Sequence, residues 1–122
     1  MTLLLVLLGG AVGAPARYLT DLFVQSRHDS LFPWGTFTVN AVGSLLLGGV
    51  AAAATVHDAP GWLLTLVGTG VCGALTTFST FGFETVRLVE DGAWLAASLN
   101  VVVSLAVGLA ACALAWWVVA SL

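Results

Sequence analysis

The stretch GALTTFSTFGF at residues 73–83 places hydroxyl and aromatic side chains inside a strongly apolar part of the chain. Four hydroxyl side chains crowd into five positions there, at Thr76, Thr77, Ser79 and Thr80. Serine and threonine side chains can hydrogen bond to nearby backbone groups and so compete with the helical ladder, and Gly73 lowers the steric cost of leaving helical dihedrals. The sequence therefore predicts a break in a helix near residues 73–76, whose freed carbonyl groups could hold a small cation.

Two phenylalanines lie three residues apart in the same stretch, at Phe78 and Phe81, so both project toward one face if the helix resumes there. Ordinary packing is one interpretation. The other uses the positive edges of the rings, which can meet an anion while the ring faces stay in hydrocarbon. Hydroxyl donors, backbone amides and aromatic edges together would suit a small, strongly hydrated anion, although these features do not select one anion.

Other polar residues lie inside apolar segments. Asn40 precedes Ser44 by four residues, which puts both on one helix face, and its amide suits either a bond between helices or an ion path. A second set recurs at every fourth position and forms one stripe, at Asn100, Ser104, Gly108 and Cys112. This stripe is either a packing seam or one wall of a water-lined or ion-lined path, and periodicity alone leaves both open.

Charged residues are few and lie near the ends of the apolar segments. Arg17 precedes Asp21 by one helical turn, so it could form an ion pair with Asp21 or anchor the helix at the headgroups. Glu84 and Arg87 are interpreted as the solvated end of the third apolar segment.

The composition points to a bilayer. The chain has 122 residues, 60% hydrophobic and 7% charged, with a mean hydropathy of +1.08, whereas a soluble domain has about a quarter of its residues charged. A net charge of −3 and the absence of any basic cluster argue against nucleic acid. No pair of nucleophile and base is evident, so we expect no enzyme. Cys72 and Cys112 are interpreted as small apolar residues rather than disulfide partners or metal ligands.

Four apolar segments are long enough to span a membrane as helices, from about residue 2 into the twenties and over about 35–55, 60–85 and 92–122. The sequence predicts an all-α membrane protein with a single domain over residues 1–122, in which short loops make neighbouring helices antiparallel. Its 14 glycines indicate close helix packing. All three arginines fall on the side of the first and third loops, which favours termini outside, and this inference weakens if Arg17 lies within a helix.

Three motifs, GGAVGAPARY, GTFTVNAVGS and GVCGALTTFSTFGFE, occur in order along the chain. In residue types and separation they resemble the CrcB/Fluc fluoride channels, and the resemblance covers nearly the whole chain. It implies four-helix subunits that pair as antiparallel, dual-topology dimers in the inner (plasma) membrane of a prokaryote. It further implies two fluoride pores per dimer, a central structural sodium ion at the dimer interface, and passive export of cytoplasmic fluoride.

The resemblance also implies roles for individual residues. Backbone carbonyl groups of Gly73 and Thr76 would bind the sodium ion. The rings of Phe78 and Phe81 would line the pore with their edges toward fluoride, and Asn40 would contribute a pore amide.

Three further residues are implicated on the same basis. Thr80 is the hydroxyl residue chosen for the polar track along the pore, and Ser104 matches a serine of that track on the fourth helix. Arg17 matches an arginine near the pore vestibule. One turn after Ser104 the family usually has a hydroxyl residue, whereas this chain has Gly108.

Partner and function each leave alternatives. The chain would form an antiparallel homodimer in membrane lipid, or a heterodimer with a second homologous subunit, as the one-sided arginines suggest. One alternative function is a small proton-coupled multidrug exporter, which needs a carboxylate inside the membrane, and only Asp21 could lie at any depth. The other is a membrane assembly subunit without transport, in which every polar stripe is a helix seam.

Overall fold

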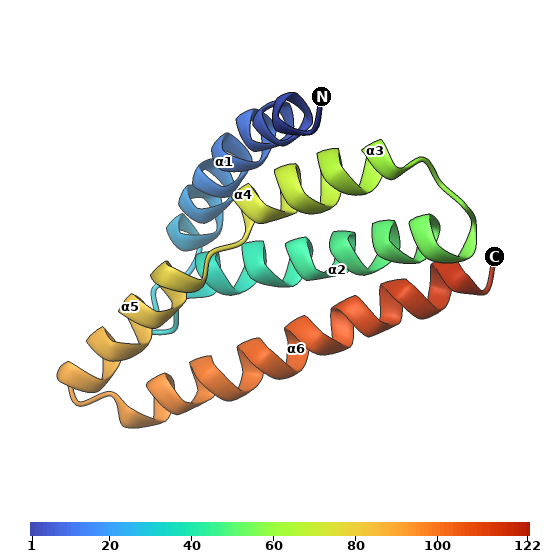
Figure 1. Cartoon of the computed structure of the whole chain (residues 1–122). Helices are drawn as coiled ribbons and strands as arrows, with labels where there is room; N and C mark the ends of the chain where they lie inside the picture. Colours follow the sequence, from blue (N-terminus) through green and yellow to red (C-terminus); the bar gives the residue numbers. More distant parts are fainter.

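The computed structural model describes residues 1–122 and is built of helices. In chain order these are α1 (Thr2–Ser26), α2 (Trp34–Val56), α3 (Gly61–Leu63), η1 (Leu64–Cys72), α4 (Gly73–Leu75), α5 (Phe78–Glu90) and α6 (Trp94–Ala120). Four segments are long and apolar enough to cross a membrane, namely α1, α2, the composite segment Gly61–Glu90, and α6. The predicted all-α membrane fold with four spans is therefore confirmed (Figure 1).

The third span ends later than the sequence analysis placed it. We expected its end near Thr85, but α5 continues to Glu90. Residues Glu84 to Glu90 continue the helix, and α5 ends two residues before Gly92. This glycine has φ +76° and donates its N–H to the carbonyl of Val89, a common way to end a helix.

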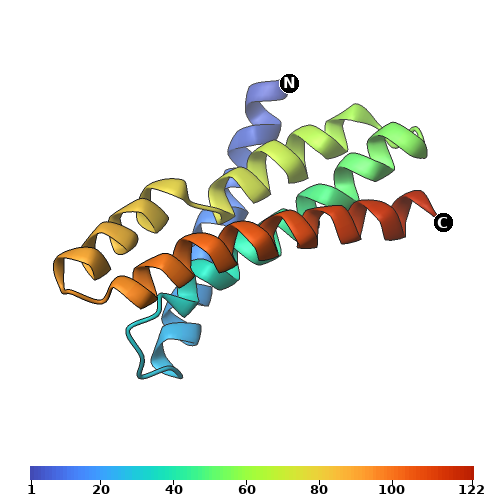
Figure 2. The same ribbon diagram turned by 90° about the horizontal axis from the view of Figure 1, so that it is seen from below.

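The helices pack through small residues. α2 and α6 run in the same direction and make the most extensive contact in the molecule (Figure 1). At their crossing Gly48 lies against the backbone of Cys112, with no room for a Cβ atom. α1 crosses the other helices steeply (Figure 2), and its Gly9 and Gly13 lie against backbone carbonyls of Leu66 and Val71 in η1. These contacts agree with the expected use of glycine for close helix approach.

The break in the third span is confirmed at the expected place. Helix α4 ends at Leu75, Thr76 has ψ 158°, and Thr77 is extended at φ −148° and ψ 123° before α5 begins. The Thr77 hydroxyl caps α5 by accepting a hydrogen bond from the N–H of Thr80 at 3.2 Å. Figure 1 shows this extended link between α4 and α5.

The segment before the break differs from a regular α-helix, because η1 is π-helical over nine residues. The hydrogen-bond spacing of a π-helix rotates every later residue relative to an α-helical register. The face that Gly73 and Thr76 occupy therefore does not follow from a 3.6-residue period counted from the start of the span.

Few side chains are enclosed within the chain. Only 17 of 122 residues are buried, and large apolar side chains are exposed along every span. In water such a surface would drive aggregation, so lipid or another subunit must cover most of it.

Candidate functional site

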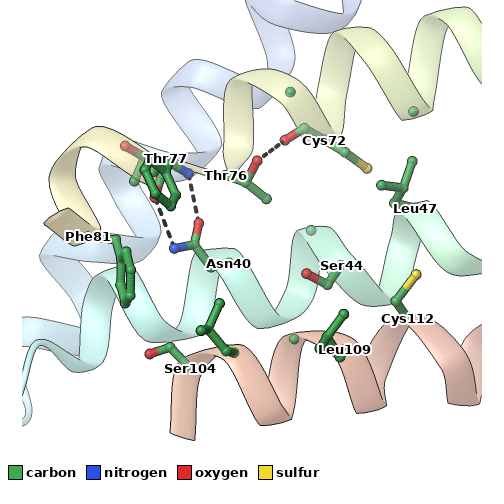
Figure 3. A pocket seen from close by; sticks show the side chains of 16 residues that line it. Asn40, Ser44, Leu47, Cys72, Thr76, Thr77, Phe81, Ser104, Leu109 and Cys112 are labelled. Atoms are coloured by element: carbon green, nitrogen blue, oxygen red, sulfur yellow. Dashed lines mark hydrogen bonds between the residues drawn. The ribbon is translucent and has the colours of Figure 1, made fainter. Parts of the chain in front are cut away.

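The break in the third span opens onto a cavity of about 450 Å³ between α2, η1, α4, α5 and α6 (Figure 3). Its lining is largely apolar and contains no charged residue. The polar groups in the lining are Asn40, Ser44, Thr76, Thr77 and Ser104, together with the thiols of Cys72 and Cys112. Phe78 and Phe81 also line it. An apolar cavity with a few converging polar groups is the usual form of a small-ligand site.

Asn40 of α2 holds the break open. Its Nδ2 donates to the carbonyl of Thr77 at 3.0 Å, and its Oδ1 accepts from the N–H of the same residue at 2.7 Å (Figure 3). Both backbone groups of an extended residue are thus satisfied by one side chain 37 residues away in the sequence. The second N–H of the Asn40 amide makes no hydrogen bond in the chain, and Asn40 lines the cavity.

The hydrogen bonds that Asn40 and the Thr77 hydroxyl accept leave free the two carbonyl groups that were expected to bind sodium. In a continuous helix the N–H of Thr77 would donate to Gly73, and that of Thr80 would donate to Thr76. Here Thr77 donates to Asn40 and Thr80 donates to the Thr77 hydroxyl. The carbonyl groups of Gly73 and Thr76 therefore lack their helical donors at the end of a half-helix. Carbonyl oxygens freed in this way fit a sodium ion.

Arg17 lies within α1 and reaches this same end of the half-helix. Its Nη1 donates to the carbonyl of Thr76 at 3.4 Å, while the carboxylate of Asp21 packs against Gly35. This contact differs from both interpretations of Arg17, as an anchor at the headgroups and as the partner of Asp21. A carbonyl oxygen has two lone pairs, so the Arg17 contact leaves one for another ligand.

The phenylalanine pair lies at the start of α5. The ring centroids of Phe78 and Phe81 are 5.9 Å apart and their planes are inclined by 44°. Phe78 is 82% exposed, so nothing in this chain covers one side of its ring. The pair does not serve as ordinary internal packing within a single chain.

The hydroxyl groups at the break bond mainly to one another. Thr77 Oγ1 donates to Thr80 Oγ1 at 3.1 Å and lies 3.4 Å from Ser79 Oγ. Thr77 lines the cavity, whereas Thr80 is exposed and does not contribute to the lining. The structure therefore places Thr80 beside the cavity and Thr77 in it.

On α6, Ser104 lines the cavity and donates to Asn100 Oδ1 at 3.2 Å. Asn100 is only 1% exposed, and its amide donates to the hydroxyl of Thr85 at 2.8 Å. Thr85 in turn donates to the carbonyl of Phe81 at 2.8 Å. This chain of bonds fixes the cavity wall of α6 to α5, and Asn100 serves as its buried link.

Glu84 was expected at the solvated end of the third span, but its carboxylate is partly buried against α2. One of its carboxylate oxygens accepts a 2.8 Å hydrogen bond from Thr36 of α2. The other oxygen is buried and has no partner in the chain. Glu84, with Asp21, Gln25 and Arg87, lines a second cavity of about 260 Å³ between the C-terminal part of α1, the loop that follows it, and α5.

The structure brings most of the expected site residues together. Asn40, Phe78, Phe81, Ser104, Gly73 and Thr76 line one cavity, while Thr80 and Arg17 contact its edge. Ser44 and Thr77 also line the cavity, although the sequence pattern did not indicate either of them as a site residue. The position of Ser44, one helical turn after Asn40, was the available signal.

A family model described as "CrcB-like protein, Camphor Resistance (CrcB)" matches residues 4–116. A relative from Frankia casuarinae is 57% identical, with 93% of this chain and 92% of the relative covered. One from Streptomyces avermitilis is 52% identical, covering 96% and 94%, and one from Nocardia farcinica is 61% identical, covering 88% and 72%. All three are named "Fluoride-specific ion channel FluC 1", which is the name of an ion channel and not of an enzyme. With its four spans, its broken third helix and a match over most of its length, the chain belongs to the CrcB-like family.

Proposed function

We propose that this chain is a subunit of a fluoride channel. The observation that carries the proposal is the cavity at the helix break, where neutral hydrogen-bond donors and aromatic rings converge without a charged residue. The names of the relatives support fluoride as the ion. A multi-pass membrane protein with such a cavity suits passive movement of a small ion across the bilayer.

The geometry suggests how an anion would be held. A dehydrated anion in an apolar cavity needs replacement donors, and the free N–H of Asn40 is one of them. The edges of Phe78 and Phe81 carry partial positive charge and add weak attraction. Because no charged side chain lines the cavity, binding of the anion stays weak enough for it to leave, as conduction requires.

A second subunit would complete the pathway. The exposed side of Phe78 and the apolar residues around the cavity need a cover, and an antiparallel copy of this chain or a homologous subunit would supply one. Such a dimer would contain two pores. The carbonyl groups of Gly73 and Thr76 would hold a structural sodium ion at its centre, and the ion would supply positive charge at the dimer interface. In the plasma membrane of a prokaryote the channel would let accumulated fluoride leave the cytoplasm.

The test is efflux from liposomes that contain only the purified chain, followed with a fluoride-selective electrode and compared with chloride-loaded vesicles. Fast fluoride release with chloride retained, and without a proton gradient, is the expected result. That result would exclude both a proton-coupled exporter and a subunit without transport. Silent vesicles would call for reconstitution together with a homologous subunit, and continued silence would refute the proposal.

A further inference from the structure

The hydroxyl groups that line the cavity differ in whether their hydrogen is available. Thr76 donates to the carbonyl of Cys72 at 2.8 Å, Thr77 donates to Thr80 at 3.1 Å, and Ser104 donates to Asn100 at 3.2 Å. A hydroxyl group has one hydrogen to donate. Each of these three side chains therefore offers lone pairs, and not its hydrogen, to a molecule in the cavity.

Ser44 is the exception among the four. It lies on α2, half-buried, in the lining of the cavity, and its Oγ has no hydrogen-bond partner in the chain (Figure 3). Hydroxyl groups inside helices commonly bond back to the carbonyl four residues earlier. On the same helix Thr38 does so to Trp34 at 2.7 Å and Thr55 to Ala51 at 2.8 Å. The Ser44 hydroxyl makes no such bond to the carbonyl of Asn40.

Gly108 of α6 has no side chain, and this leaves space beside the Ser44 hydroxyl. A Cβ atom built at residue 108 would lie 3.5 Å from Ser44 Oγ, an ordinary contact distance. The side-chain-free backbone of residue 108 thus faces the hydroxyl across the cavity, and the neighbouring lining from Leu47, Leu105 and Leu109 is apolar. A donor in such surroundings is unfavourable without a partner, and nothing in the chain provides one.

We infer that Ser44 donates its hydroxyl hydrogen to the permeating anion, one helical turn beyond the free N–H of Asn40. This inference rests on the proposed fluoride channel and adds a residue to it. Two neutral donors on one face of α2 would give the anion successive positions along the cavity. A small anion with concentrated charge gains most from such donors.

The experiment compares Ser44→Ala with the unsubstituted chain in the liposome assay. Ser121→Ala is the matched control, because the same group is removed but the Ser121 hydroxyl already donates to Trp117 and lies outside the cavity. We expect Ser44→Ala to slow fluoride efflux about tenfold or more, as loss of a hydrogen bond to a charged group implies. Its elution volume in detergent should stay that of the unsubstituted protein, and Ser121→Ala should conduct normally.

A double variant tests the position of the hydroxyl. Ser44→Ala combined with Gly108→Ser returns a hydroxyl to the same space from the opposite helix, and part of the lost flux should return. Efflux by Ser44→Ala at the unsubstituted rate would overturn the inference and leave the fluoride channel standing. So would loss of assembly in Ser44→Ala, or no recovery in a double variant that assembles normally. If the unsubstituted chain conducts no fluoride, alone or with a homologous subunit, the proposed function and the inference fall together.

Discussion

Replacement of Asn40 by alanine tests whether this side chain maintains the helix break. The substitution removes both hydrogen bonds to Thr77, at 3.0 and 2.7 Å. Each such bond contributes about 1 kcal/mol net, so Asn40→Ala should lower the free energy of unfolding by about 2 kcal/mol. At about 1.4 kcal/mol for each factor of ten, this is roughly a 30-fold shift of the equilibrium.

The five tryptophans give a fluorescence signal for unfolding by denaturant in mixed micelles. Thr38→Ala serves as the control on the same helix, because the Thr38 hydroxyl donates only to the carbonyl of Trp34, one turn earlier in α2. The effect of this substitution on the free energy of unfolding should stay within about 0.5 kcal/mol. An Asn40→Ala protein as stable as the unsubstituted one, within the same margin, would refute the reasoning.

Three further predictions follow from the packing and the site. Gly9→Ala should destabilise the protein by about 1–3 kcal/mol by overpacking against η1, whereas a Cβ at the adjacent Gly10 would meet nothing closer than 4.0 Å. Gly10→Ala should thus be neutral, and equal unfolding midpoints for the two variants would contradict this packing. Phe78→Ile should lose fluoride efflux in liposomes while the protein keeps its elution volume, and full conduction would exclude a role for the ring. Removal of sodium should slow efflux or weaken dimers seen by cross-linking, and indifference to sodium would count against Gly73 and Thr76 as its ligands.

The architecture could be predicted because its causes are local. Four apolar segments of sufficient length dictate four spans, since lipid leaves backbone groups no partner outside a helix. The break could be predicted for a similar reason, because the four hydroxyl residues of the 73–80 stretch favour local alternatives to the helical ladder. The expected contribution of Gly73 was wrong, since this residue keeps helical dihedrals at φ −62° and ψ −36°. The end of the third span was missed because charged residues were taken as a stop signal, although the helix continues until a residue with positive φ, Gly92, ends it.

The contacts of the site could not be predicted, because they depend on groups far apart in the chain. The sequence left Arg17 either paired with Asp21 one turn away or anchored at the headgroups, but the fold brings the carbonyl of Thr76, 59 residues away, within reach of its guanidinium. The π-helical register of η1 decides which face that carbonyl occupies. Helical spacing counted along the sequence contains neither piece of information.

The availability of hydrogen-bond donors in the cavity also depends on the fold. From sequence, Thr80 and Ser104 were assigned to the polar track and Thr76 to sodium through its carbonyl, whereas Ser44 had no assigned role. In the structure Thr80 lies outside the cavity lining, and the hydrogens of Thr76 and Ser104 are already committed to other groups. The residue type determines which hydrogen bonds a side chain can donate, whereas the fold determines whether the hydrogen is still free. The residues to test first for anion contact are therefore those with an unused donor facing the cavity, Asn40 and Ser44, rather than every polar residue of the stripe.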